Sequence, residues 1–372
     1  MKPNPFRWFE IDARGVRFGL LASALLLPTF ALAGPDALVA TDSLWDDGRI
    51  EVCFGTSATV VNPKADMAKD VRKIRRVRDH SPLESRIHDV LEREYTPERT
   101  GMRFAGYGNC DRVPRDEPNA PAFIFADTDS KTFGLTSIGD ESKDLAPADR
   151  RGIISGAIFG LAAVRANKDY SVAKGANALL KVVEPGSPTA NAIIDLAADL
   201  DEELKDQLVD VTIIHEMGHL AGLLHEESRK DAKGHQPDWC RSAGDKGEQD
   251  KSTEKTVGTE FDPFSVMDYC TDDIAKGFAF YHLFCSAPKV SAELSRRNPK
   301  FEWKVMAPYC GYMQSRNYAA RLSIRDRAAL RRVYLGVPVP PGSRSYRSNP
   351  EEVRVLKAMD ALYEALPDSV VR

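Results

Sequence analysis

The sequence predicts a mixed α+β fold, and three observations lead to that expectation. Short apolar runs bordered by Gly, Pro or polar residues, which are typical of strands, occupy the first part of the chain. Longer stretches with apolar residues at helical spacing follow from residue 201 onward. The composition, 42% hydrophobic and 28% charged over 372 residues, is that of a globular protein with one large domain or two modest ones.

The N-terminus is expected to be a cleaved secretory signal covering residues 1–33. Two arginines precede an apolar run over residues 19–33, which ends in Ala-Leu-Ala before a glycine. The run is shorter than the about 20 apolar residues that a membrane-spanning helix needs, and it contains Pro28. We therefore expect a secreted or periplasmic protein, with no stable membrane insertion after the signal is removed.

Six cysteines follow this signal, and an even number in an oxidising compartment predicts disulfides. None of them stands at C-x-x-C spacing, which argues against a structural zinc site or a redox motif. Proximity along the chain favours three pairs: Cys53–Cys110, Cys240–Cys270 and Cys285–Cys310.

The first half of the chain alternates strand and helix patterns. Residues 44–61 begin with an Asp-Gly turn and continue as a strand. Residues 64–95 favour a helix that is interrupted near a Ser-Pro pair. The runs GMRFAGYG (101–108) and AFIFAD (122–127) predict two further strands. The run GAIFGLAAV (156–164) fits a buried strand or a helix, because periodicity alone does not separate the two.

Nucleic acid is not expected as a partner. The basic run RKIRRVR (72–78) has no interleaved aromatic residues, so it is interpreted as a solvated helix face. The formal net charge of −4 also disfavours binding to a polyanion.

Residues 201–222 give the clearest helical pattern. The segment opens with acidic residues, which a helix N-terminus favours. Apolar residues such as Leu204 and Leu208 then recur at helical spacing, and a glycine provides a natural stop. The polar residues 228–262 that follow predict loops.

The remaining segments complete the predicted organisation. Residues 261–270 form a compact, turn-like apolar segment, and residues 271–317 hold two cysteines without a clear pattern. Residues 322–336 predict a helix with a serine cap and a glycine stop. Residues 337–350 have a linker composition, and a short amphipathic helix over 351–372 is expected to pack on the domain or to act as a regulatory element.

The stretch HEMGHLAGLLHE (215–226) carries the strongest chemical signal. His215 and His219 are four residues apart, so both imidazoles lie on one helix face. Gly222 allows the chain to turn and to bring His225 back to the same point. Three neutral imidazoles bind Zn²⁺ and leave a position open for water. Glu216, one residue along the helix, flanks that point.

This spacing is the H-E-x-x-H-x-x-G-x-x-H pattern of the metzincins, which also have a methionine turn downstream. The sequence resembles astacin-type zinc metallopeptidases in particular. Those carry a glutamate after the third histidine, here Glu226, and a turn of the form Ser-x-Met-x-Tyr, matched by Ser265, Met267 and Tyr269. The chain departs from them at Asp268, where astacins usually carry a histidine.

The resemblance implies a metzincin-type peptidase domain with a twisted mixed sheet, an active-site helix and a Met-turn. It covers roughly residues 44–336 and is strongest at 211–231 and 262–270. The expected domain is then 34–336, with an N-terminal subdomain of about 44–225 and a C-terminal subdomain of about 226–336.

The resemblance also implies roles for the site residues. His215, His219 and His225 are expected to hold one catalytic Zn²⁺. Glu216 is the expected general base, and Tyr269 the expected fifth ligand, which moves away and hydrogen-bonds the oxyanion. By the same resemblance, a methionine packs beneath the site and the glutamate after the third histidine anchors the domain through hydrogen bonds.

The expected function is a secreted zinc metalloendopeptidase that hydrolyses peptide or protein substrates. Two alternatives stay open: another zinc hydrolase, such as a deacetylase, on the same scaffold, and a non-catalytic secreted protein that binds a partner and uses zinc for stability. An intact Glu216 argues against the second, because a structural site needs no base. The other four histidines are expected to be surface or core residues: His80, His88, His235 and His282.

Overall fold

A computed structural model describes the main secondary-structure elements of the chain. The described residues are 37–39, 44–45, 47–54, 81–109, 122–126, 134–136, 156–159, 172–226, 255–257, 262–267, 278–316, 320–337 and 350–365. They all belong to one compact unit within residues 33–372. The predicted signal, most of the linker and the first half of the helix predicted over 64–95 lie outside them.

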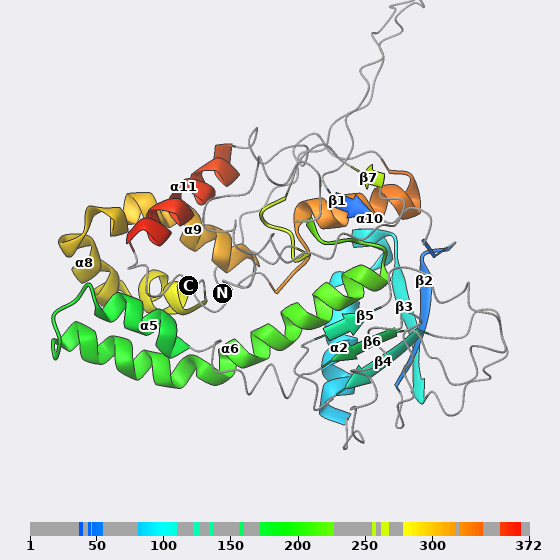
Figure 1. Cartoon of the computed structure of the whole chain (residues 1–372), viewed down its shortest axis with the longest axis horizontal. Coiled ribbons are helices and arrows are strands. Elements are labelled where there is room, and N and C mark those ends of the chain that lie inside the picture. The colour runs from blue at the N-terminus through cyan, green and yellow to red at the C-terminus, as the bar shows by residue number, and fades with distance from the viewer. Residues whose placement is uncertain are drawn as a thin grey trace, which may run out of the picture. The chain divides into compact units, whose positions relative to one another are not determined.

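A mixed five-stranded sheet forms one part of the molecule (Figure 1). Its strands run in the order β3-β2-β4-β6-β5 and are β2 (Arg49–Phe54), β3 (Arg103–Asn109), β4 (Ala122–Ala126), β5 (Gly134–Thr136) and β6 (Gly156–Phe159). Pairing is parallel from β3 to β6, whereas β5 is an antiparallel edge strand. The strands predicted in the first half are confirmed, and the ambiguous run at 156–164 begins as a strand.

A second, two-stranded sheet lies close to the histidine motif in the fold. Strand β1 (Ala37–Val39) pairs antiparallel with β7 (Lys255–Val257). Val39 also forms a bridge to Leu223, which lies between the second and third histidines of the motif. The first described residues of the chain therefore pack against the segment that follows the motif helix.

Helix α6 (Pro188–Leu220) is 33 residues long and carries the motif at its C-terminal end. The acidic residues near Asp201 predicted that the helix starts there, but it starts at Pro188. The N-cap is Ser187, whose hydroxyl accepts a hydrogen bond from the Ala190 amide at 3.1 Å, and proline is favoured at the first helical position. The acidic residues lie mid-helix, where Asp201 pairs with Lys205 at 3.1 Å.

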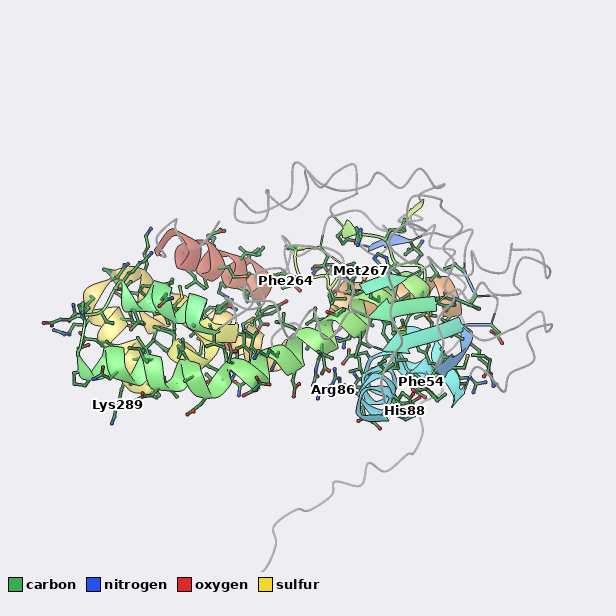
Figure 2. All side chains as sticks on the ribbon, turned by 60° about the horizontal axis from the view of Figure 1, so that its bottom comes forward. Phe54, Arg86, His88, Phe264, Met267 and Lys289 are labelled. Carbon is green, nitrogen blue, oxygen red and sulfur yellow. A yellow bond between two sulfur atoms is a disulfide. The ribbon has the colours of Figure 1, made fainter. Side chains whose placement is uncertain are left out.

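Helix α2 (Ser81–Glu94) anchors α6 through a buried carboxylate. Asp210 of α6 is buried and accepts from the guanidinium of Arg86 at 2.5 Å and of Arg93 at 3.4 Å. Arg86 is labelled in Figure 2. The short helix α3 (Pro97–Thr100) follows and leads into β3, so α2 and the sheet together hold the C-terminal half of α6.

Residues 278–316, which lack a clear sequence pattern, fold as helices. These are η8 (Tyr281–Cys285), α8 (Pro288–Arg297), η9 (Pro299–Phe301) and α9 (Trp303–Arg316). Phe280, Phe284 and Phe301 stack in their core, with Phe280 and Phe284 centroids 4.7 Å apart. The Cys285–Cys310 disulfide joins η8 to α9, as predicted from proximity. Cys53 is also disulfide-bonded, and the other predicted pairs involve cysteines outside the described residues.

Two further helices close the described chain. Helix α10 (Ile324–Leu335) has the predicted serine cap and ends at Gly336, which is left-handed with φ 64°. Helix α11 (Pro350–Ala365) packs against α9 and buries Val355, Ala358 and Leu362. The remaining helix of the first half, α5 (Val172–Leu180), packs along α6. None of the described helices combines the length and the apolar character needed to cross a bilayer.

Removal of the Cys285–Cys310 disulfide by a double alanine substitution should lower the free energy of unfolding by about 3 kcal/mol, because the bond closes a loop of 25 residues in the unfolded chain. Denaturant unfolding of the purified protein measures this. The exposed neighbour Ser286→Ala serves as control, and equal midpoints for the double variant and the control would contradict the expectation.

Candidate metal centre

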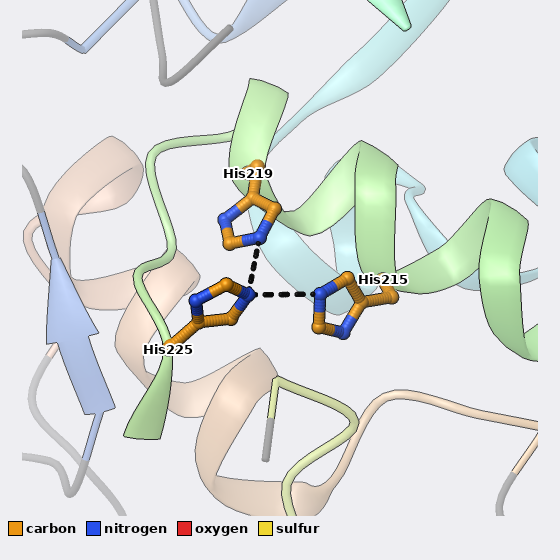
Figure 3. A group of neighbouring side chains, drawn as sticks. All are labelled: His215, His219 and His225. Carbon is orange, nitrogen blue, oxygen red and sulfur yellow. Dashed lines mark hydrogen bonds between the residues drawn. The ribbon is translucent and has the colours of Figure 1, made fainter. Parts of the chain in front are cut away.

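The three histidines of the motif converge on one point (Figure 3). His215 and His219 project from the last two turns of α6, and His225 returns from the segment beyond it. The Nε2 atom of His225 lies 3.1 Å from that of His215 and 2.9 Å from that of His219. The convergence expected from their spacing is confirmed, and the three residues form a group that could hold a metal ion.

Two backbone carbonyls fix which nitrogen faces this point. The Nδ1 atom of His215 lies 2.8 Å from the carbonyl oxygen of Val266, and that of His219 lies 2.8 Å from the carbonyl oxygen of Leu223. A carbonyl oxygen only accepts, so both Nδ1 atoms carry the hydrogen and both Nε2 atoms present a lone pair. An outer hydrogen bond of this kind is what orients metal-bound histidines.

The donor set fits a zinc ion. Ligands in a tetrahedron about 2.0–2.1 Å from zinc lie about 3.3 Å from one another, close to the Nε2 separations of 2.9 and 3.1 Å. Because His215 and His219 both present lone pairs, a hydrogen on His225 Nε2 could satisfy one of them at a time. A cation at the centre would satisfy all three nitrogens at once.

Burial keeps the three imidazoles in the neutral form that binds metals. Desolvation lowers the pKa of His215. Desolvation and the neighbouring His215 together lower the pKa of His219 to about 3. The pKa of His225 is lowered further, by desolvation first and then by the other two histidines. No proton therefore has to leave these groups at neutral pH before a metal binds.

The end of α6 is built to return the chain to the site. Gly222 has φ 93°, a conformation that residues with a side chain rarely adopt, and its amide donates to the His219 carbonyl at 2.8 Å. The indole of Trp45 donates to the Leu220 carbonyl at 2.8 Å. These bonds satisfy carbonyls that a helix end leaves free, so the reversal before His225 costs no buried polar group.

The segment 262–267, named here the methionine turn, lies beneath the histidines. Met267 is 1% exposed, and its sulfur occupies the space that a Cβ atom on Gly218 would need. Figure 2 labels Met267 and Phe264 on this turn. The Tyr95 hydroxyl also lies next to Gly218 and donates to the Ile214 carbonyl at 2.6 Å. The glycine within the motif therefore makes room for the methionine.

Glu226 ties the methionine turn to the motif. Its carboxylate accepts from the Asp262 amide at 3.1 Å, and its own amide donates to the Met267 carbonyl at 3.2 Å. The anchoring role expected for Glu226 is confirmed. Because Glu226 directly follows His225, the same bonds also fix the third histidine.

Asp326 of α10 fixes the methionine turn through hydrogen bonds. Its carboxylate accepts from the Ser265 hydroxyl at 2.6 Å, from the Val266 amide at 3.3 Å and from the Ser323 amide at 2.8 Å. The last of these belongs to a capping box, so one carboxylate both begins α10 and positions Val266. Sequence reasoning recognised the serine cap of this helix but not the contact with the turn.

Of the two predicted catalytic residues, Glu216 is among the described residues and Tyr269 is not. Glu216 is 7% exposed and follows His215 on α6, so its carboxylate is part of the buried end of that helix. Tyr269 lies outside the described residues, two positions after Met267. His88 and His282 lie on other elements, and His80 and His235 are outside the described residues.

A Gly218→Ala substitution should destabilise the protein by about 1–3 kcal/mol, because the new methyl group displaces the Met267 sulfur. In a double-mutant cycle with Met267→Ala, the two losses should be less than additive, since the second change frees the space that the first one needs. Urea unfolding of the four proteins gives the coupling. Strict additivity would show that the two positions do not compete.

The metal-free protein should lose stability as the pH falls below 6.5, the ordinary histidine pKa. Between pH 6.5 and about 3 an unfolded chain binds a proton at residue 219, whereas the folded chain does not. Acid therefore favours unfolding, by up to about 1.4 kcal/mol per pH unit for each such histidine. Unfolding curves with a chelator present should show a shallower pH dependence for His219→Gln. An unchanged slope would contradict this.

Comparison with known proteins identifies no family for this chain. No family model matches the sequence, and no curated protein matches it. A solved structure similar to the chain is that of myroilysin, with 12% sequence identity and a TM-score of 0.28, covering 62% of this chain and 82% of that chain. Similarity at this level decides neither fold nor function. The function has to be inferred from the site itself.

Proposed function

We propose that the protein is a zinc-dependent metalloendopeptidase of the astacin-like metzincin type. The observation that carries the proposal is the convergence of three neutral imidazoles on one point, with the outer nitrogens of His215 and His219 fixed by backbone carbonyls. The pattern H-E-x-x-H-x-x-G-x-x-H and the buried Met267 beneath it support the same assignment.

Three histidines would hold the metal: His215, His219 and His225. A zinc ion bound there supplies a Lewis acid that polarises a carbonyl and lowers the pKa of water. The protein's own contribution is to keep the three nitrogens neutral and to hold them at fixed separations. The bonds from the methionine turn and from Leu223 keep the imidazoles of His215 and His219 from rotating away.

Glu216 is the proposed general base. It follows His215 on α6, so its carboxylate projects about 100° around the helix, beside the imidazole cluster and not within it. There it would accept a proton from water as the oxygen forms its bond to the scissile carbonyl carbon. It would then deliver that proton to the amide nitrogen as the carbon–nitrogen bond breaks. One carboxylate thus completes the proton balance of hydrolysis.

Tyr269 is the proposed oxyanion donor. It follows the methionine turn by two residues, and the backbone at Met267 is fixed by the amide of Glu226. A phenol from this position would donate to the oxygen that gains charge as water adds. Asp268, between them, is where the chain departs from the astacin pattern.

An extended peptide is the proposed substrate. Strand β5 is an antiparallel edge strand, and it packs against α6. Such an edge offers main-chain donors and acceptors to a peptide that adds as another strand. The Cys285–Cys310 disulfide supports an extracytoplasmic location, secreted or periplasmic.

Glu216→Gln should retain zinc while its cleavage of an unfolded protein falls by about 100- to 10,000-fold, because the amide keeps the shape of the carboxylate but accepts no proton. The measurements are zinc content after dialysis and the cleavage rate of the mature chain. Glu202→Gln is the matched control, since Glu202 is on the same helix and exposed.

Three results would count against the proposal. Zinc-loaded protein without cleavage would favour the alternative of a zinc-stabilised binding protein. Cleavage that survives both a chelator and Glu216→Gln would place the activity elsewhere. Absence of zinc binding by the wild type would remove the metal centre itself.

A further inference from the structure

The C-terminal helix α11 contacts the methionine turn through two arms. It lies outside the segment that carries the metzincin pattern, after residues of linker composition. One arm is polar and runs through Glu352, and the other is apolar and runs through Val355. Both arms meet the turn near its start, at Asp262 and Phe264.

The polar arm is a relay of ion pairs centred on the buried Arg325. Glu352 binds the guanidinium of Arg325 in a bidentate manner, at 2.6 Å to Nη2 and 3.3 Å to Nη1. Arg325 also pairs with Asp262 at 3.3 Å. Arg325 is 2% exposed and Asp262 is fully buried. A bidentate carboxylate fixes the plane of a guanidinium, so Glu352 sets how Arg325 meets Asp262.

The apolar arm lies next to this relay. Phe264 and Val355 are both buried in one small cluster, with Tyr312, Leu356 and Met359 packed around them. The rings of Phe264 and Tyr312 lie 4.8 Å apart. Helix α11 thus covers the side chain of Phe264, which lies two positions after Asp262 in the methionine turn.

The methionine turn passes this constraint on to the histidines. The Asp262 carboxylate accepts from the Phe264 amide at 3.0 Å and from the Ser323 hydroxyl at 2.7 Å, while its amide donates to Glu226. At the other end of the turn, the Val266 carbonyl accepts from His215. The path from α11 to the imidazoles therefore consists of ion pairs and hydrogen bonds between buried and part-buried groups.

The charges around the turn explain why the relay needs a cation held in place. Four carboxylates, those of Glu226, Asp262, Asp326 and Glu352, lie within this small region, and the first three are buried. Arg325 contacts two of the four. Buried charges are stable when paired with good geometry, so a displaced guanidinium would leave Asp262 poorly compensated.

We propose that α11 is a positioning element of the metal centre, and that Glu352 is its positioning residue, acting through Arg325 and Asp262 on the methionine turn. This rests on the proposed function only for the identity of the metal. Loss of the Glu352 charge loosens the turn, frees the Val266 carbonyl to move, and weakens the hold on His215.

The first test uses the metal-free, full-length chain and does not depend on zinc. In Glu352→Gln the amides of Val266 and Met267 should exchange hydrogen for deuterium severalfold faster than in wild type, while amides on the buried face of helix α5 exchange as before. Glu352→Asp keeps the charge and should give intermediate exchange. Glu351→Gln removes an exposed charge from the same turn of α11 and should have no effect.

The second test measures zinc affinity by competition with a chelator, well below the unfolding temperature. Glu352→Gln should raise the zinc Kd about tenfold, the lower range for loss of an outer partner of a metal site. Leu179→Ala, in the buried face of α5, removes stability away from the turn and should leave the Kd unchanged. This control separates positioning from a general loss of stability.

The outcomes are distinct from those for the peptidase. Faster exchange of the turn together with weaker zinc binding supports the proposal. Unchanged exchange, or faster exchange with an unchanged zinc Kd, overturns it and leaves α11 as a packed helix. If the wild type binds no zinc, the proposed function fails, and the exchange of the turn alone decides whether Glu352 holds it.

Discussion

The hydrogen bond between His215 and the Val266 carbonyl is the constraint on which the site depends. It determines the tautomer of one imidazole and thereby the direction of its lone pair. That bond exists only where the methionine turn lies directly under the end of α6. The turn buries the apolar side chains of Phe264, Val266 and Met267. Its backbone is held by Asp326 from α10 and by Glu226 from the motif, two buried carboxylates that accept from backbone amides.

A site held by buried carboxylates depends on the whole domain being folded. Each such group loses its hydration on burial and is stable only with several donors in place. Those donors come from the methionine turn and from the start of α10. Glu226 of the motif and Asp326 of α10 are 100 residues apart in the sequence. No local segment assembles the centre alone, so metal binding and tertiary structure are expected to form together.

The sequence predicted the features that depend on residues close together in the chain, and not those that depend on distant residues. The meeting of the three histidines rests on helical spacing and one glycine, and the capped helix α10 on a serine and a glycine at its ends; both are local rules. The start of α6 was predicted wrongly, because acidic residues near Asp201 resemble a helix N-terminus yet lie exposed in mid-helix beside Lys205. The packing of Phe280 on Phe284 and Phe301, and the relay through Arg325, join distant residues and leave no periodic trace. Tyr269 remains a prediction.

The contact between Gly218 and Met267 links two positions that are 49 residues apart in the sequence. Neither residue chemically requires the other, but the space over the helix holds either a side chain at 218 or the sulfur from 267. In an alignment of homologous chains, positions 218 and 267 should therefore vary together. A small residue is expected at one position wherever the other carries a long side chain. The glycine at position 218 of α6 then reflects the side chain that lies opposite it, and not flexibility at that point of the helix.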